Sequence, residues 1–110
     1  MSHDISLVHD FGAGEIEVGN LDWNYTRNVS PMWRLAMPHT DGLNGLHGKL
    51  AGDAAIVLED GIAAMESDPD AYRALNPPNG WGDFDSQLER LKVLLGEFRK
   101  APDATVRVDA

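Results

Sequence analysis

The first 29 residues alternate between apolar and polar side chains, the pattern of β-strands with one buried face. Strands are predicted at residues 4–9 and 15–18, and a longer one at residues 21–29. One side of the longer strand, interrupted only by Arg27, carries Leu21, Trp23, Tyr25 and Val29. Its other side carries the short polar residues Asp22, Asn24, Thr26 and Asn28. Because Gly19-Asn20 suits a two-residue turn, the three strands are expected to form an antiparallel meander.

Beyond residue 30 the apolar positions recur every three and four residues, which predicts helices. Ser30 and Pro31 suit the start of a brief helix over residues 31–37. Further helices are predicted at residues 49–66, at 69–74, and from Asp83 or Asp85 to residue 100. Gly52 and Gly61 suit close packing of the second of these helices against a neighbour. Residues 38–48 are polar and glycine-rich and are expected to form a loop, and residues 105–108 a final strand.

Strands followed by helices and one last strand predict an α+β fold. We expect a small antiparallel sheet, made of the N-terminal meander and the C-terminal strand, covered by two main amphipathic helices and short helical segments. The length of 110 residues fits a single domain over residues 1–110, in which residues 1–20 form an N-terminal extension or hairpin.

Charge narrows the choice of partners. Eighteen acidic and nine basic residues give a formal net charge of −9, which repels phosphate backbones and anionic lipid. Direct nucleic-acid binding is therefore not expected, whereas a basic protein, including one that normally holds nucleic acid, is a suitable partner. The alternative is that the acidity serves solubility alone. The absence of cysteine, of a signal-peptide pattern and of a long apolar run predicts a cytoplasmic protein with no membrane association.

Two polar segments are candidates for a ligand site. Asn24, Thr26 and Asn28 lie where the long strand meets a helix start, and amide and hydroxyl groups recognise ligands rather than act as bases. The second segment, residues 76–82, places Asn79 and Trp81 in a turn that contains two prolines and two glycines. Both have structural alternatives: local turn formation for the polar side chains and a core anchor for Trp81. A ligand site requires the two segments to converge on one pocket.

Catalytic and metal-binding patterns are weak in this chain. His39, Asp41 and His47 are metal-ligand types within nine residues, but they lack a defined ligand spacing, so we interpret them as exposed loop residues. The serines fall in strand or cap positions and supply no nucleophile with a base. We therefore identify no catalytic residue and expect no cofactor and no metal; these observations favour a protein that is not an enzyme and leave an enzyme as the less favoured alternative.

Both polar segments resemble parts of a family of small, functionally uncharacterised phage and bacterial proteins. The matching strings are Tyr25-Thr26-x-Asn28-Val29 before a Met- and Trp-bearing helix start, and Asn76-Pro-x-Asn-Gly-Trp-Gly82. The resemblance covers residues 22–108 and points to Thr26, Asn28, Asn79 and Trp81; residues 1–20 depart from it. It implies a phage or actinobacterial source and a self-contained cytoplasmic domain.

These observations predict a small acidic phage-type accessory protein that acts by binding a host or phage protein. The alternative is a domain that binds a small, nucleotide-like ligand through the Thr26/Asn28 strand end and the Asn79/Trp81 turn. Self-association is compatible with either function.

Overall fold

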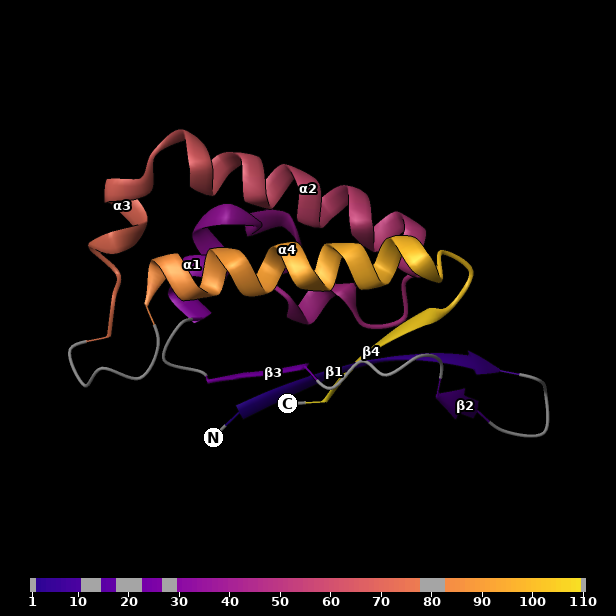
Figure 1. The fold of residues 1–110 in the computed structure, drawn as a ribbon. Helices are drawn as coiled ribbons and strands as arrows, with labels where there is room; N and C mark the ends of the chain where they lie inside the picture. Colours follow the sequence, from indigo (N-terminus) through magenta and orange to yellow (C-terminus); the bar gives the residue numbers. More distant parts are fainter. Residues whose placement is uncertain (1, 11–14, 18–22, 27–29, 78–82, 110) are drawn as a thin grey trace.

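The computed structural model describes residues 2–10, 15–17, 23–26, 30–77 and 83–109 (Figure 1). The strands are β1 (Ser2–Asp10), β2 (Glu15–Glu17), β3 (Trp23–Thr26) and β4 (Thr105–Asp109). The α-helices are α1 (Ser30–Ala36), α2 (Ala51–Ser67), α3 (Pro69–Arg73) and α4 (Phe84–Lys100). Two 3-10 helices, η2 (Pro38–Thr40) and η3 (Asn44–Leu46), lie between α1 and α2. The expected order of elements is therefore confirmed along the described chain.

Strand β1 is the centre of the sheet, and its three partners all run antiparallel to it. Asp4 is paired with Asn24 of β3 and with Asp109 of β4, and Val8 with Glu17 of β2 and Thr105 of β4. Strand β4 lies along one side of β1. On the other side of β1, β3 pairs with the first half of the strand and β2 with the second half. A meander would pair β2 with β3 instead; the Gly19-Asn20 turn lies outside the described residues.

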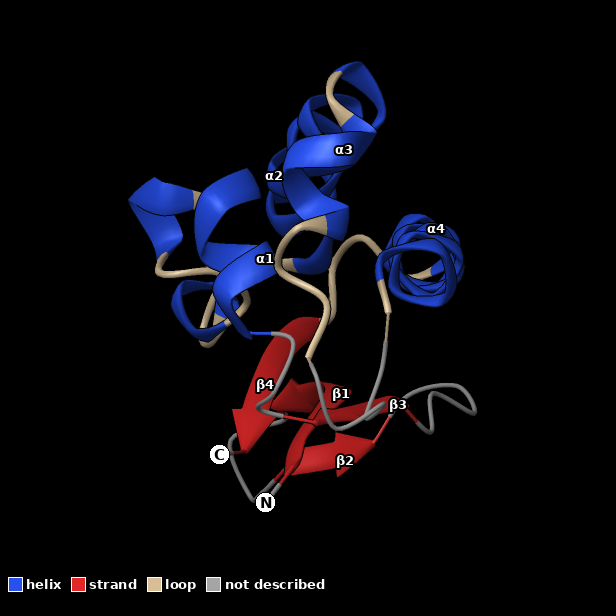
Figure 2. Cartoon of the chain, turned by 90° about the vertical axis from the view of Figure 1, so that its left-hand side faces the viewer, coloured by secondary structure: helices blue, strands red, loops and turns tan. Residues whose placement is uncertain are grey.

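All the helices cover one face of this sheet, with α2 and α4 in the layer above it (Figure 2). Ile5 and Leu7 of β1 and Val106 of β4 face that layer and are buried in the core. Alternate strand residues point to opposite faces, so the period of two places these apolar residues together. The α+β class, with two main helices over an antiparallel sheet, is confirmed. Within the described residues, no helix is long and apolar enough to cross a membrane.

Asp83, the first of the two predicted caps, is the N-cap of helix α4. The Asp83 side chain accepts a hydrogen bond of 2.8 Å from the Ser86 backbone N–H. Asn76 Oδ1 accepts another, of 2.9 Å, from the Phe84 backbone N–H, so the preceding segment also fixes the helix start. The hydrogen bond from Ser86 lowers the pKa of Asp83, because it stabilises the charged carboxylate.

The expectation of a polar loop at residues 38–48 is wrong in one respect. Leu43 and Leu46 are 1% and 0% exposed and belong to the core, and the adjoining Met37 is also buried. Two glycines allow this compact path. Gly42 has a φ of +68° and lies so close to Trp33 that an added Cβ would be 2.8 Å from the Trp33 Cβ. At Gly45 an added Cβ would lie 2.7 Å from the Thr40 Cα. The segment is a packed part of the helical layer.

Candidate functional site

The predicted ligand residues lie only partly within the described chain. Asn28, Asn79 and Trp81 fall outside the described residues. The backbone of β3 places Asn24 opposite Asp4 of β1, and Thr26 opposite Ser2. Convergence of the two predicted segments on one pocket therefore stays a prediction.

Helices α3 and α4, which precede and follow the predicted turn at residues 76–82, are joined by side-chain contacts. Arg73 forms an ion pair of 2.9 Å with Asp85, and its guanidinium carbon lies 5.2 Å from the centre of the Phe84 ring. Tyr72 packs against the same ring at a centroid distance of 5.9 Å. Burial, followed by the nearby charge of Asp68, raises the pKa of the Tyr72 hydroxyl. These contacts hold the end of α3 against the start of α4.

Two of the three potential metal ligands of residues 38–48, Asp41 and His47, have structural partners instead, and the third, His39, is exposed. Asp41 accepts hydrogen bonds from Arg34 Nε at 2.9 Å and from Asn44 Nδ2 at 3.3 Å. The Nδ1 atom of His47 accepts one of 3.0 Å from the Val108 backbone N–H, which connects the segment to β4. In the part of the chain that the structure describes, no group of three or more His, Asp or Glu residues could hold a metal ion.

A cavity of ≈180 Å³ lies between residues 36–40 and helix α2. Most of its wall is apolar, formed by Ala36, Met37 and Pro38 on one side and Val57 of α2 on the other. His39, Thr40 and Asp60 add the polar part of the lining. The cavity opens to solvent, because Pro38, His39 and Asp60 are exposed.

Gly61 brings the two walls of the cavity close together. A Cβ added at Gly61 would lie 2.8 Å from Met37 Cγ, so only a glycine leaves room for Met37 in its present position. The sequence expectation that Gly61 packs closely against a neighbour is confirmed. Gly52 fulfils the same expectation at the other end of α2, where its N–H donates to the Pro102 carbonyl at 2.9 Å.

Short hydrogen bonds hold the 36–40 wall in place. Thr40 Oγ1 donates to the Gly42 carbonyl at 2.8 Å, and the Gly42 N–H donates to the Met37 carbonyl at 3.0 Å. The ion pair between Arg34 and Asp41 connects the end of this segment back to α1. Because the wall is fixed by local contacts, the cavity is largely preformed and needs little rearrangement to receive a group.

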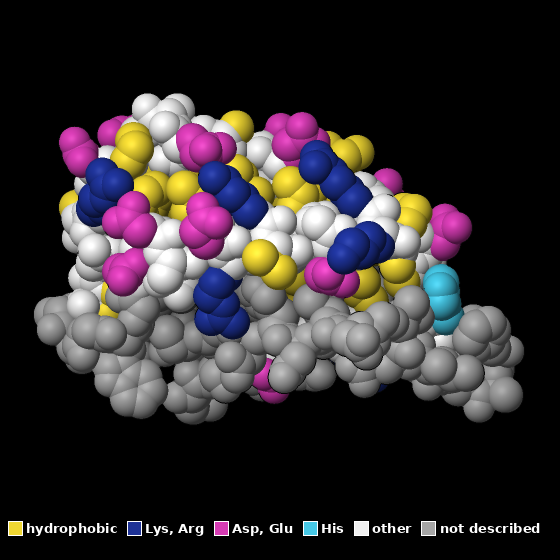
Figure 3. Space-filling model, viewed as in Figure 1, with side chains coloured by type: hydrophobic (Ala, Val, Ile, Leu, Met, Phe, Trp, Pro, Cys, Tyr) yellow, Lys and Arg dark blue, Asp and Glu magenta, His cyan; other side chains and the backbone are white. Residues whose placement is uncertain are grey.

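Helix α2 carries four acidic residues and no Lys or Arg. Glu59 pairs with Arg99 of α4 at 3.1 Å, and Glu66 pairs with Lys92 at 3.5 Å. Figure 3 shows these mixed charges along the side of the molecule where α2 and α4 run together. Asp53 and Asp60 differ: within the described residues, neither has a Lys or Arg at ion-pair distance. The α2 carboxylates that pair with α4 are thus neutralised, whereas Asp60, at the cavity, and Asp53 keep their negative charge.

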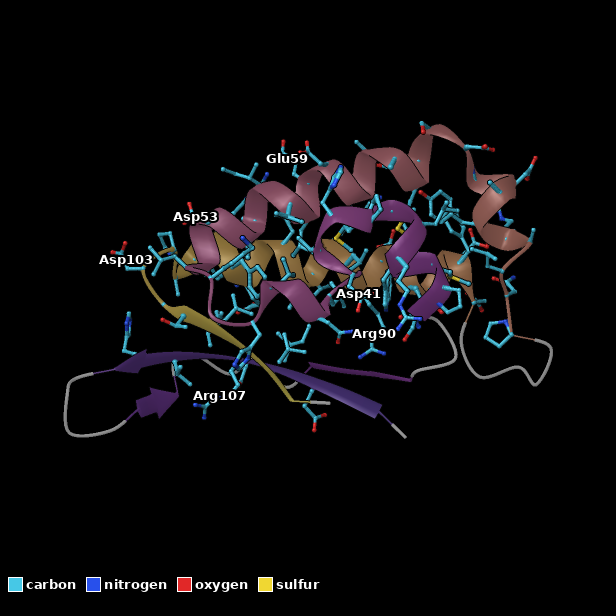
Figure 4. The ribbon with its side chains drawn as sticks, turned by 180° about the vertical axis from the view of Figure 1, so that it is seen from behind. Asp41, Asp53, Glu59, Arg90, Asp103 and Arg107 are labelled. Carbon is cyan, nitrogen blue, oxygen red and sulfur yellow. The ribbon has the colours of Figure 1, made fainter. Side chains whose placement is uncertain are left out.

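The outer surface of α2 also exposes a large apolar side chain. Ile56 is 61% exposed, and on a helix it neighbours Asp60 four positions later. Its sequence neighbour Val57 lines the cavity. Figure 4 shows Asp53 and Glu59 on the outer side of the same helix, away from the sheet. We call Ile56, Val57, Asp60 and the cavity the α2 surface.

Sequence reasoning missed this site, because an acidic residue such as Asp60 is ordinary on the solvated side of a helix. One signal was available: Asp53 and Asp60 lie seven residues apart, about two helical turns, in a helix with no basic residue. Comparison of the chain with protein-family models, curated proteins and solved structures finds no match.

Proposed function

We propose that this chain is a small phage-type accessory protein that acts without catalysis, by binding a host or phage protein through the α2 surface. The observation that carries the proposal is the exposed Ile56 beside a preformed, mostly apolar cavity. The phage context and a bacterial cytoplasm as the place of action rest on the sequence resemblance.

The energetics favour a protein partner for this surface. Burying an isoleucine side chain contributes about 1.5–3 kcal/mol, and that gain is largely unused while Ile56 is 61% exposed. A single exposed aliphatic residue is common on protein surfaces. Here it adjoins a cavity that a partner side chain can enter, and such a pairing of an apolar contact with a pocket is typical of the centre of an interface.

The negative charge of α2 favours a basic protein over a nucleic acid as the partner. Asp60 at the cavity, and Asp53 two helical turns before it, carry carboxylates without a described Lys or Arg at ion-pair distance, within a chain of net charge −9. Phosphate groups would be repelled there, which disfavours direct contact with DNA or RNA. A protein with a basic surface would be attracted and steered toward it.

Site-specific photo-crosslinking tests this function. The photoreactive residue p-benzoylphenylalanine would replace Ile56 in one variant and Glu89, on the exposed side of α4, in a matched control. Both variants would be irradiated in bacterial cells that carry the protein's natural partners, and the adducts would be identified by mass spectrometry. We expect position 56 to give one dominant adduct with a single bacterial or phage protein, and position 89 to give none of it.

Two results would contradict the proposal. Equal adducts from positions 56 and 89 would show that the α2 surface has no special role. A dominant adduct between two copies of this chain would show that the surface serves self-association instead of binding a host or phage protein.

A further inference from the structure

We infer that the cavity at Asp60 receives one long basic side chain, an arginine or lysine, from a basic segment of the partner protein. This inference rests on the proposed function and specifies the chemistry of the partner. The alkyl stem of the side chain would lie against Met37 and Val57, and its cationic group would pair with the Asp60 carboxylate.

The size of the cavity favours a single side chain. Pockets for free small molecules usually measure about 300–1,000 Å³. The cavity here measures ≈180 Å³, which is too small for a nucleotide-sized ligand but suits one extended side chain. Insertion of such a side chain would remove apolar wall from water on both partners.

The lining matches the two halves of a basic side chain. Lysine and arginine bury an apolar stem while the charged end stays near water or a partner charge. The apolar wall formed by Ala36, Met37 and Val57 suits the stem, and Asp60 lies at the same cavity with an exposed carboxylate. Since no basic residue of α2 competes for Asp60, the carboxylate is available for a cation from outside.

Asp53 extends the acidic surface beyond the cavity. It precedes Asp60 by seven residues, which corresponds to about 10 Å along the helix axis. A partner segment that presents two basic side chains about 10 Å apart on the same face would place one in the cavity and the other beside Asp53.

Fragment titration by nuclear magnetic resonance tests the inference on the full chain. The probe is 1-butylguanidinium, which reproduces an arginine stem and head; guanidinium ion and 1-pentanol represent the head and the stem alone. We expect saturable amide shifts centred on Met37, Thr40 and Val57. Butylguanidinium should bind at least about fourfold more tightly than guanidinium, the ratio for one buried methylene group.

Two charge variants separate site binding from general attraction to an acidic protein. Asp60→Asn should weaken butylguanidinium binding about threefold, as expected for one exposed ion pair, and should leave pentanol binding unchanged. Asp53→Asn, which removes the same charge outside the cavity, should leave the butylguanidinium affinity unchanged. Thermal unfolding of both variants would confirm that the fold is intact.

Equal weakening by Asp60→Asn and Asp53→Asn, or shifts spread over the whole surface, would overturn the inference. Binding of guanidinium as tight as that of butylguanidinium would also overturn it, because the apolar wall would then contribute nothing. If these results accompany a dominant adduct from position 56, the protein-binding function stands and only the basic side chain is rejected. If the titration succeeds while crosslinking fails, the cavity accepts the cation but the proposed function is rejected.

Discussion

Gly45→Ala is the sharpest test of the packed segment that forms one wall of the cavity. An added Cβ would lie 2.7 Å from the Thr40 Cα and 2.8 Å from the Thr40 Cβ, and would also overlap the Thr40 carbonyl oxygen. Thr40 has little freedom to move, because its hydroxyl is bound to the Gly42 carbonyl and Leu46 beside Gly45 is fully buried.

The magnitude follows from two opposing effects. Overpacking of a rigid site costs about 1–3 kcal/mol. Alanine also reduces the entropy of the unfolded chain, which restores about 0.4–1 kcal/mol. We therefore expect Gly45→Ala to lower the free energy of unfolding by roughly 1–2 kcal/mol. For a chain of this length that corresponds to a fall in Tm of about 4–8 °C.

Gly96→Ala is the matched control for the same substitution. Gly96 lies inside α4, and an added Cβ there would meet nothing within 4 Å. Only the helix propensity and the unfolded-chain entropy change, so this variant should gain about 0.5–1 kcal/mol. The two variants should thus move in opposite directions from the wild type.

Urea unfolding followed by far-ultraviolet circular dichroism measures both variants. The midpoint should fall for Gly45→Ala and rise for Gly96→Ala, with similar denaturant slopes in all three proteins. A Gly45→Ala variant as stable as the wild type would refute the close approach of Gly45 to Thr40, and with it the packed path of residues 37–46. A lower midpoint in both variants would show that crowding at Thr40 is not the cause of the destabilisation of Gly45→Ala.

Three further substitutions test other parts of the fold by the same urea assay. Gln87 is only 4% exposed, and its Oε1 has no hydrogen-bond partner in the described part of the chain. Gln87→Met should therefore raise the free energy of unfolding by about 1 kcal/mol. A lower free energy of unfolding would show that the amide is satisfied. Asp83→Ala should cost about 1 kcal/mol at pH 7. The pKa of Asp83 is lowered in the fold, so the stability difference between the wild type and Asp83→Ala is full above the unfolded pKa of about 3.9. The difference should shrink as the pH falls below that value. An unchanged stability difference at pH 2.5 would contradict the role of the Asp83 carboxylate as a cap. Gly48 has a φ of +85°, and an added Cβ there would meet nothing within 4 Å. Gly48→Ala should therefore lower the free energy of unfolding by about 1–2 kcal/mol through backbone strain alone, and Gly48→Asn should lower it less.

The segment after α1 contains a signal that helix and strand periods do not detect. Its sequence Gly42-Leu-Asn-Gly-Leu-His-Gly48 repeats every three residues, which is the period of a 3-10 helix. Side chains three positions apart then eclipse one another, so Leu43 and Leu46 fall on one face and both are buried. Glycine content and polar neighbours suggested a loop, whereas the period of three indicated a compact, buried path.

The candidate site could be predicted only in part. The sequence identified Gly61 as a position of close packing, and the structure confirms it through Met37. The cavity itself depends on two segments that are about twenty residues apart, and Asp60 has the same local sequence character as the solvated Glu59. What distinguishes the two carboxylates is that α4 supplies Arg99 to Glu59 and no cation to Asp60.

The sequence by itself determined the four α-helices of the described chain, a cap of α4 at Asp83 or Asp85, and the α+β class. These features depend on apolar period and on capping groups within about four residues, which any local reading captures. Only the tertiary structure placed β2 and β3 along one edge of β1 and separated neutralised from free carboxylates on α2. Strand order, cavities and ion pairs depend on which distant faces meet, and many small packing energies across the whole chain decide that together.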